Sequence, residues 1–285
     1  MANRPLDEPA RGLRPIRCHN VPDSEPQADL ATLLAVPGPG QAVVLVAAGL
    51  VGGAVGAAGG VTSLVSYSAL LGVGVPPLQA NVCNLVAGVA CWPGSASTSR
   101  RELAGTNRSL TGMLALAGCA AAAGSVALLV TPPGVFVRLA PFLVALASLA
   151  MLVQPWLSAR APRDSGRLRL LTWPLTGLVS IYSGYFGAGS GIMLLAVLLV
   201  LVDNRVPEAN AIKNMLLGAA TLASAVVFVV AGPVDWTAVV PLAAGLFAGS
   251  AAGPVIARRV SPRALRWAVA GLGFGLAVTL WWHQG

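Results

Sequence analysis

The sequence predicts an all-α polytopic membrane protein built from two homologous repeats. Its composition, its distribution of charges and an internal match between its two halves predict this fold. Of the 285 residues, 56% are apolar by type and 10% are charged, with a mean hydropathy of +0.76. Soluble domains carry about 25% charged residues. Runs of about 20 apolar residues, the length that a bilayer core requires, occur several times.

The N-terminal segment, residues 1–41, differs from the rest of the chain. It holds nine of the 28 charges, is rich in proline and arginine, and lacks the apolar core of a signal peptide. We expect residues 1–41 to form a polar, disordered tail. Elsewhere the basic residues lie mostly at the ends of apolar segments, as the positive-inside rule requires of cytoplasmic loops. In a soluble protein, a net charge of +8 would suggest nucleic-acid binding. Here the location of the basic residues predicts instead a lipid bilayer as partner, in the cell membrane, and no nucleic acid.

Eight apolar segments follow the tail, and tryptophans near their ends are typical of an aromatic belt. The first and the fifth of these segments are too long for one span. Both are broken in the middle, the first by Gly56, Gly59 and Gly60, the fifth by Gly187, Gly189 and Gly191. The segments cover residues 42–74, 77–98, 110–131, 135–157, 171–202, 209–231, 237–257 and 264–282.

The two glycine breaks match each other when the sequence is aligned with itself so that Gly53 meets Gly184. Ten of the 36 positions 53–88 are then identical, including Pro76 with Pro207. Such a match indicates an internal duplication. It divides the chain into a first repeat over residues 42–157, a basic linker over 158–170 and a second repeat over 171–285.

Loop charges indicate that the repeats have opposite orientations. The loop after the second segment is basic, whereas its equivalent, 232–236, has no basic residue. The next pair shows the reverse, since 131–138 holds only Arg138 and 258–266 holds four arginines. Under the positive-inside rule, equivalent loops then lie on opposite sides of the membrane. Inversion requires each glycine-broken segment to be a hairpin that enters and leaves on one side; eight simple crossings are the alternative.

Broken segments at matching positions of two repeats predict a transporter's binding site near the membrane midplane. Small residues at a break let the backbone approach a ligand, although close helix packing explains the same glycines. Polar side chains in the helices that follow the breaks also need partners. The candidate substrate-binding residues are Gly56, Gly59, Gly60, Asn81, Asn84, Gly187, Gly189, Gly191, Asn210, Lys213 and Asn214.

Lys213 is the only lysine in the chain, and it lies within an apolar stretch. An ammonium group is costly there, and a small anionic substrate would offset the cost. The alternative is a lysine that extends its amine to the membrane surface. We expect Asn84 and Asn214 to orient the anion. Further candidate donors are the hydroxyls of Thr62, Ser63, Tyr182, Tyr185 and Ser190.

The patterns of enzymes and metal proteins are missing from the sequence. Both histidines lie near the extremities, and the four cysteines lack the spacing of metal ligands. The acidic residues of the membrane segments lie at segment ends, so paired carboxylates for acid–base work are not expected. There is no nucleotide-binding Walker motif. We therefore expect neither an enzyme nor a cofactor.

Two related motifs follow the breaks: Pro76, Ala80 and Asn84 in the first half, and Pro207, Ala211 and Asn214 in the second. Together with the Gly245, Gly249 and Gly253 spacing ahead of two arginines, this order resembles the sulfite exporter TauE/SafE family of membrane permeases over about residues 42–282. The resemblance implies transport of small sulfur-containing anions, such as sulfite or organosulfonates. The alternatives are a non-transporting membrane scaffold or assembly protein, and a transporter of another small anion.

Overall fold

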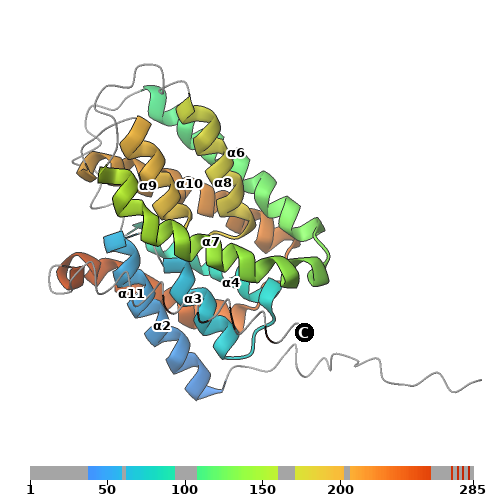
Figure 1. The fold of residues 1–285 in the computed structure, drawn as a ribbon. Helices are drawn as coiled ribbons and strands as arrows, with labels where there is room; N and C mark the ends of the chain where they lie inside the picture. The colour runs from blue at the N-terminus through green and yellow to red at the C-terminus, as the bar shows by residue number, and fades with distance from the viewer. Residues whose placement is uncertain are drawn as a thin grey trace, which may run out of the picture. The chain divides into compact units, whose positions relative to one another are not determined.

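The structure is a computed structural model that describes residues 38–59, 62–93, 108–159, 171–201 and 206–257, and positions 271, 275, 278 and 282. All regular structure within these residues is helical (Figure 1), which confirms the predicted all-α class. Residues 1–37 of the predicted tail, Gly60, and most of both the linker 158–170 and the last apolar segment lie outside the described residues.

The helices follow the predicted apolar segments in order. The first broken segment forms α2 (Pro39–Gly59) and α3 (Thr62–Gly72), and α4 (Pro77–Gly88) leads into the 3₁₀ turn η1 (Val89–Cys91). Helices α6 (Arg108–Val130) and α7 (Pro133–Ala159) complete the first half. The second half contains α8 (Thr172–Tyr185), α9 (Ser190–Leu201), α10 (Val206–Ala231) and α11 (Trp236–Ala257). Proline opens α2, α4 and α7, where its missing N–H has no helical partner to lose.

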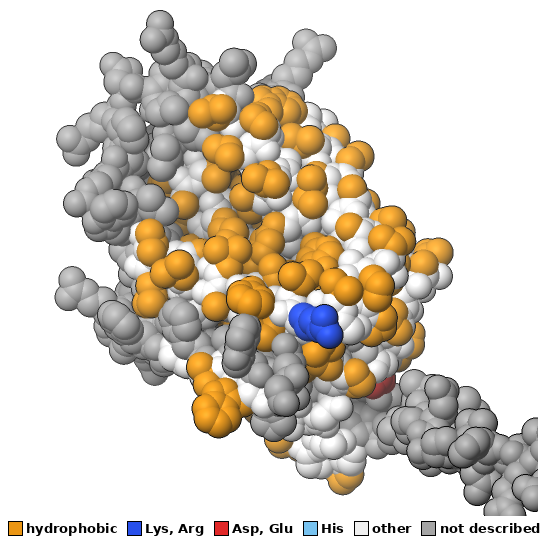
Figure 2. Space-filling model, turned by 45° about the vertical axis from the view of Figure 1, so that its right-hand side comes forward, with side chains coloured by type: hydrophobic (Ala, Val, Ile, Leu, Met, Phe, Trp, Pro, Cys, Tyr) orange, Lys and Arg blue, Asp and Glu red, His pale blue; other side chains and the backbone are white. Residues whose placement is uncertain are grey.

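Four of the described helices, α2, α6, α7 and α10, are long and apolar enough to cross a membrane. Their outer faces expose large apolar side chains, such as Val43, Val126, Phe142 and Val230. Figure 2 shows one face of the molecule, where hydrophobic side chains are spread over the described surface. Lipid tails are the solvent that such a surface fits, because water would disfavour so many exposed apolar groups. The chain is a polytopic membrane protein.

Both glycine-broken segments fold back on themselves as helical hairpins (Figure 1). In the first, Gly52 of α2 packs against Thr62 and Val65 of α3. The side-chain amide of Gln41, near the start of α2, donates to the carbonyl of Val73 just after α3, at 3.4 Å. In the second hairpin, α8 packs against α9. We call the described residues on either side of the glycine break in each hairpin its tip: Gly56, Thr62 and Ser63 in the first, and residues 185–191 in the second.

Each hairpin packs against a helix from the other half of the chain. Helix α2 lies along α11, and α8 lies along α6. Both contacts depend on small residues that let the helix backbones touch. A Cβ atom at any of these glycines would overlap backbone atoms of the opposite helix: Gly49, Gly53, Gly245 and Gly249 between α2 and α11, and Gly124 and Gly184 between α6 and α8.

Candidate functional site

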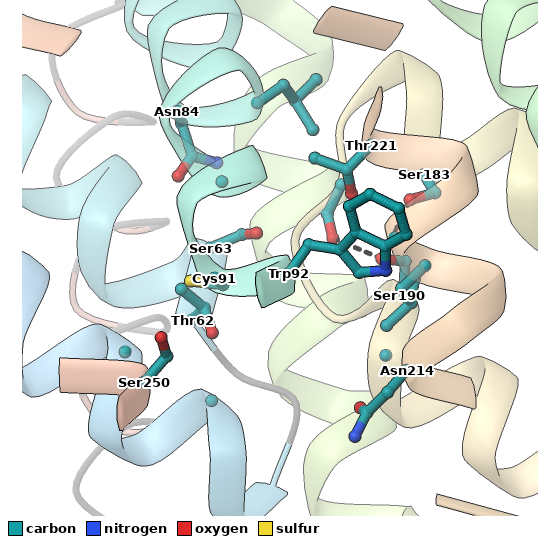
Figure 3. Close-up of a pocket in the computed structure, with 18 of the residues that line it drawn as sticks. Thr62, Ser63, Asn84, Cys91, Trp92, Ser183, Ser190, Asn214, Thr221 and Ser250 are labelled. Atoms are coloured by element: carbon teal, nitrogen blue, oxygen red, sulfur yellow. Dashed lines mark hydrogen bonds between the residues drawn. The ribbon is translucent and has the colours of Figure 1, made fainter. Parts of the chain in front are cut away.

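A cavity of about 110 Å³ lies where the two hairpin tips meet α4 and α10 (Figure 3). One water molecule fills roughly 10–15 Å³ of such space, so the cavity has room for several waters or one small ion. Small and polar residues dominate its wall. The first hairpin contributes Gly53, Gly56, Thr62 and Ser63, the second contributes Ser183, Gly187, Ser190 and Gly191, and α10 contributes Lys213, Asn214, Gly218 and Thr221.

Lys213 supplies the charge of the cavity. Its side chain is 1% exposed, so it does not extend to the membrane surface. The structure describes two carboxylates, Glu208 and Asp235, and neither forms an ion pair with Lys213. The side chain of Asp235 caps the start of α11, where its Oδ1 accepts a hydrogen bond from the N–H of Thr237 at 2.9 Å. A buried cation without a counter-charge is costly, and an anion in the cavity would remove that cost.

Two further N–H donors at the cavity have no acceptor within the described part of the protein. The Oδ1 atom of Asn84 is held by the hydroxyl of Ser66, which leaves Asn84 Nδ2 buried and unpaired. The indole Nε1 of Trp92 is also buried without a partner. Leaving a buried donor unpaired costs about 1–3 kcal/mol. A ligand with acceptor oxygens would recover this cost.

The short helix of each hairpin begins at the cavity wall. Thr62 opens α3, and Ser190 and Gly191 open α9. The Ser190 N–H and Oγ both donate to the carbonyl of Gly187, at 3.2 and 2.7 Å. No described backbone carbonyl accepts from the N–H of Gly191 in the same turn. Unpaired N–H groups and the positive end of the dipole make a helix start suitable for an anion.

The tip of the second hairpin is held in place by hydrogen bonds from several elements. Gly187 and Gly189 have φ values of +79° and +77°, which glycine adopts without the strain of a side chain. The hydroxyl of Tyr182 donates to the carbonyl of Ala188 at 2.7 Å. Asn81 Nδ2, from α4, donates to the carbonyl of Tyr185 at 2.9 Å. The carbonyls at the end of α8 thereby find donors that the broken helix does not provide.

The structure brings six of the eleven predicted site residues to one cavity and places three others elsewhere. Asn81 holds the second tip through Tyr185, and Gly189 packs against Ala147 of α7. Asn210 is half-buried on α10, outside the described cavity wall, and Gly59 is described only as the last residue of α2. Gly60 lies outside the described residues. The six at the cavity are Gly56, Asn84, Gly187, Gly191, Lys213 and Asn214.

Several residues of the cavity wall are not predicted by the sequence. The sequence places Trp92 only in an aromatic belt, whereas it lines the cavity. The wall also includes Ser183, Thr221 and Ser250, single hydroxyls in apolar helices that no spacing sets apart. In the sequence, Trp92 follows closely after the polar residues of α4, and this closeness is the signal that could have placed it in the site. Among the candidate hydroxyls, Thr62, Ser63 and Ser190 line the cavity, whereas Tyr182 and Tyr185 do not.

Comparisons with known proteins identify the family of the chain. Residues 42–280 match the family model described as Sulfite exporter TauE/SafE, a family of transporters rather than enzymes. The chain is also similar to a probable membrane transporter protein of Haemophilus influenzae, with 24% identity over 247 residues, which are 85% of this chain and 95% of the relative. No solved structure matches the chain. Because the family match spans residues 42–280, well over half of the chain, the chain belongs to the sulfite exporter TauE/SafE family of multi-pass membrane transporters.

Proposed function

We propose that the chain is a secondary transporter that carries small sulfur-containing anions, such as sulfite or organosulfonates, across the cell membrane. The observation that supports this most directly is Lys213, a buried lysine that faces a polar cavity without a counter-charge among the described residues. The family description supplies the sulfur oxyanion. The size of the cavity, about 110 Å³, fits a small ion.

In the proposed complex, the substrate is held by positive charge and by N–H donors. Lys213 balances the negative charge, while Asn84 Nδ2, Trp92 Nε1 and the N–H of Gly191 donate to the anion's oxygens. Hydrogen bonds to a charged acceptor are about twice as strong as neutral ones. The described cavity wall holds no acidic side chain, so a cation finds no counter-charge there and would also be repelled by Lys213. An anion therefore gains more binding free energy from this site than a cation does.

We also propose that the two halves are inverted repeats. In support, the alignment that pairs Gly53 with Gly184 relates α2 to α8, α3 to α9, α4 to α10 and α6 to α11. The packing follows the same relation, because α2 packs on α11 just as α8 packs on α6. In transporters built this way, the substrate site lies between the repeats, and rocking of one repeat against the other opens it to each side in turn.

Anion binding to the purified protein in detergent tests the proposal. Sulfite, methanesulfonate, phosphate and acetate would each be titrated while the melting temperature is recorded. At 100 times the dissociation constant, a bound ligand stabilises the folded state by about 2.7 kcal/mol. We expect sulfite or the sulfonate to raise the melting temperature of the wild type and of Ser125→Ala, a buried α6 variant outside the cavity wall. Lys213→Ala should lose the effect, and Lys213→Arg should retain part of it.

Two results would contradict the proposal. If no anion stabilises the wild-type protein, the cavity is not an anion site. If anions bind but no sulfite or sulfonate flux is measured in proteoliposomes, the protein is a binding or scaffold protein and not a transporter. Lys213→Ala removes a buried charge that has no counter-charge among the described residues, and with it the cost of burying that charge, so a folded variant is expected.

A further inference from the structure

We infer that Trp92 sets the upper size limit of the transported anion, with Gly218 as the seat that holds its ring. This inference rests on the proposed function and names the residue that selects among sulfur-containing anions by length. Trp92 is the largest side chain in the cavity wall, where most other members are glycine, serine, threonine or asparagine. One bulky ring among small neighbours is therefore the main limit on the space available.

The indole of Trp92 lies directly on the backbone of α10. A Cβ atom at Gly218 would overlap Cδ1 and Nε1 of the ring, so glycine is required at that position for the ring to stay there. Helices α4 and α10 also approach closely one turn earlier, where a Cβ at Gly88 would lie 3.5 Å from Cγ2 of Thr221. The crossing of the two helices thus fixes the position of the ring.

Figure 3 shows the ring between two groups of polar side chains. Asn84 and Ser63 lie on one side, and Ser183, Ser190 and Asn214 lie on the other. An anion held by these donors has the indole as its neighbour. The ring then has two roles: its Nε1, which has no acceptor in the described structure, donates to an oxygen, and its carbon face blocks an alkyl tail.

A 3₁₀ turn separates Trp92 from the regular part of α4. Residues Val89–Cys91 adopt the tighter 3₁₀ geometry, and Trp92 follows directly. Short 3₁₀ stretches often mark hinges in helices.

A series of alkanesulfonates of increasing chain length tests this inference. Methane-, ethane-, butane- and hexanesulfonate would compete with sulfite for binding to the purified protein and for uptake into proteoliposomes. For the wild type, we expect affinity to fall sharply once the tail exceeds the space beside the indole. Trp92→Ala should bind the longer sulfonates at least about tenfold better relative to methanesulfonate, as expected when a steric limit is removed.

Three further variants separate the two roles of the ring. Trp92→Phe keeps an aromatic ring and loses the N–H, so it should keep the length limit and weaken all the anions about tenfold. Gly218→Ala should displace the indole and shift the length limit with Trp92 still present. Trp236→Ala, an exposed tryptophan at the start of α11 and outside the cavity wall, is the matched control and should behave as wild type.

The outcomes distinguish this inference from the proposed function. An unchanged length series in Trp92→Ala and Gly218→Ala, with sulfite still bound, overturns the role of Trp92 and leaves the anion site intact. If wild-type protein binds none of the anions, the proposed function itself fails. Should Trp92→Ala not fold, the Gly218→Ala variant still decides the question, because it is expected to shift the length limit with Trp92 present.

Discussion

The ring of Tyr67 in α3 meets the ring of Phe186 at the second hairpin tip edge to face, with the ring centroids 5.4 Å apart and the planes at 77°. Both side chains are fully buried. Through this pair, the first hairpin contacts the turn that presents Gly187 and Ser190 to the cavity. We therefore expect this pair to help hold the two hairpins together beside the cavity.

Replacing Phe186 should loosen the junction of the two tips. We expect Phe186→Ala to cost about 3–5 kcal/mol, because a buried aromatic ring is removed and a cavity remains. Thermal unfolding in detergent measures the effect. Phe247→Ala removes the same side chain from an exposed position on α11 and should change the melting temperature little. Equal losses of melting temperature in the two variants would show that the Tyr67–Phe186 contact stabilises the protein no more than an exposed phenylalanine does.

Asn84 and Asn81 form a matched pair of buried amides on α4 with different roles. Asn84 Nδ2 is unpaired at the cavity, whereas Asn81 Nδ2 donates to the carbonyl of Tyr185. We expect Asn84→Ala to weaken sulfite binding by about tenfold, the value of one hydrogen bond to a charged group. Asn81→Ala should instead lower the melting temperature, since it leaves a tip carbonyl without its donor. Isothermal titration and thermal unfolding, run on both variants, separate these effects; the reverse pattern would contradict the assignment.

Gly56 is expected to tolerate no side chain. A Cβ at this position would overlap the hydroxyl of Thr62, the first residue of α3. Gly56→Ala should therefore displace the start of α3 from the cavity, with a loss of about 1–3 kcal/mol in stability and reduced anion binding. Gly40→Ala, where no atom lies within 4 Å of the added Cβ, serves as the control for the same substitution in α2. Normal binding by Gly56→Ala would show that the first tip does not shape the site.

The orientation of the two repeats can be tested with single cysteines in a background that lacks the four native ones. If the repeats are inverted, cysteines introduced at Ala104 and Pro262 lie on the same side of the membrane. A membrane-impermeant thiol reagent applied to sealed vesicles should then label both or neither. Labelling of only one of the two positions would contradict inversion and favour eight simple crossings.

Much of the fold follows from patterns that are visible in the sequence. Apolar length and the scarcity of charge predict the long helices, and glycine runs within two overlong segments predict the two breaks. Prolines at 39, 77 and 133 mark helix starts in the structure. These features are local, so one stretch of sequence is enough to identify them.

The site was only partly predictable because its wall is assembled from distant segments. Lys213 could be selected because a lone lysine in an apolar stretch is unusual. Asn81 and Asn84 look alike in sequence, and only the fold shows that one reaches Tyr185 while the other faces the cavity. Trp92 could not be distinguished from an aromatic residue of the membrane surface, because its seat at Gly218 lies in the other half of the chain.

The pairing of α2 with α11 has a consequence for how the protein is made. The glycines of Pro39–Gly59 fit the backbone of Trp236–Ala257, which lies in the other half of the chain and is synthesised much later than α2. During translation, α2 therefore enters the membrane long before α11 has been made. Until then, the face of α2 that carries Gly49 and Gly53 is covered by lipid or by an insertion chaperone. Truncated chains that end before Trp236 should leave that face uncovered and be recognised by quality-control proteases.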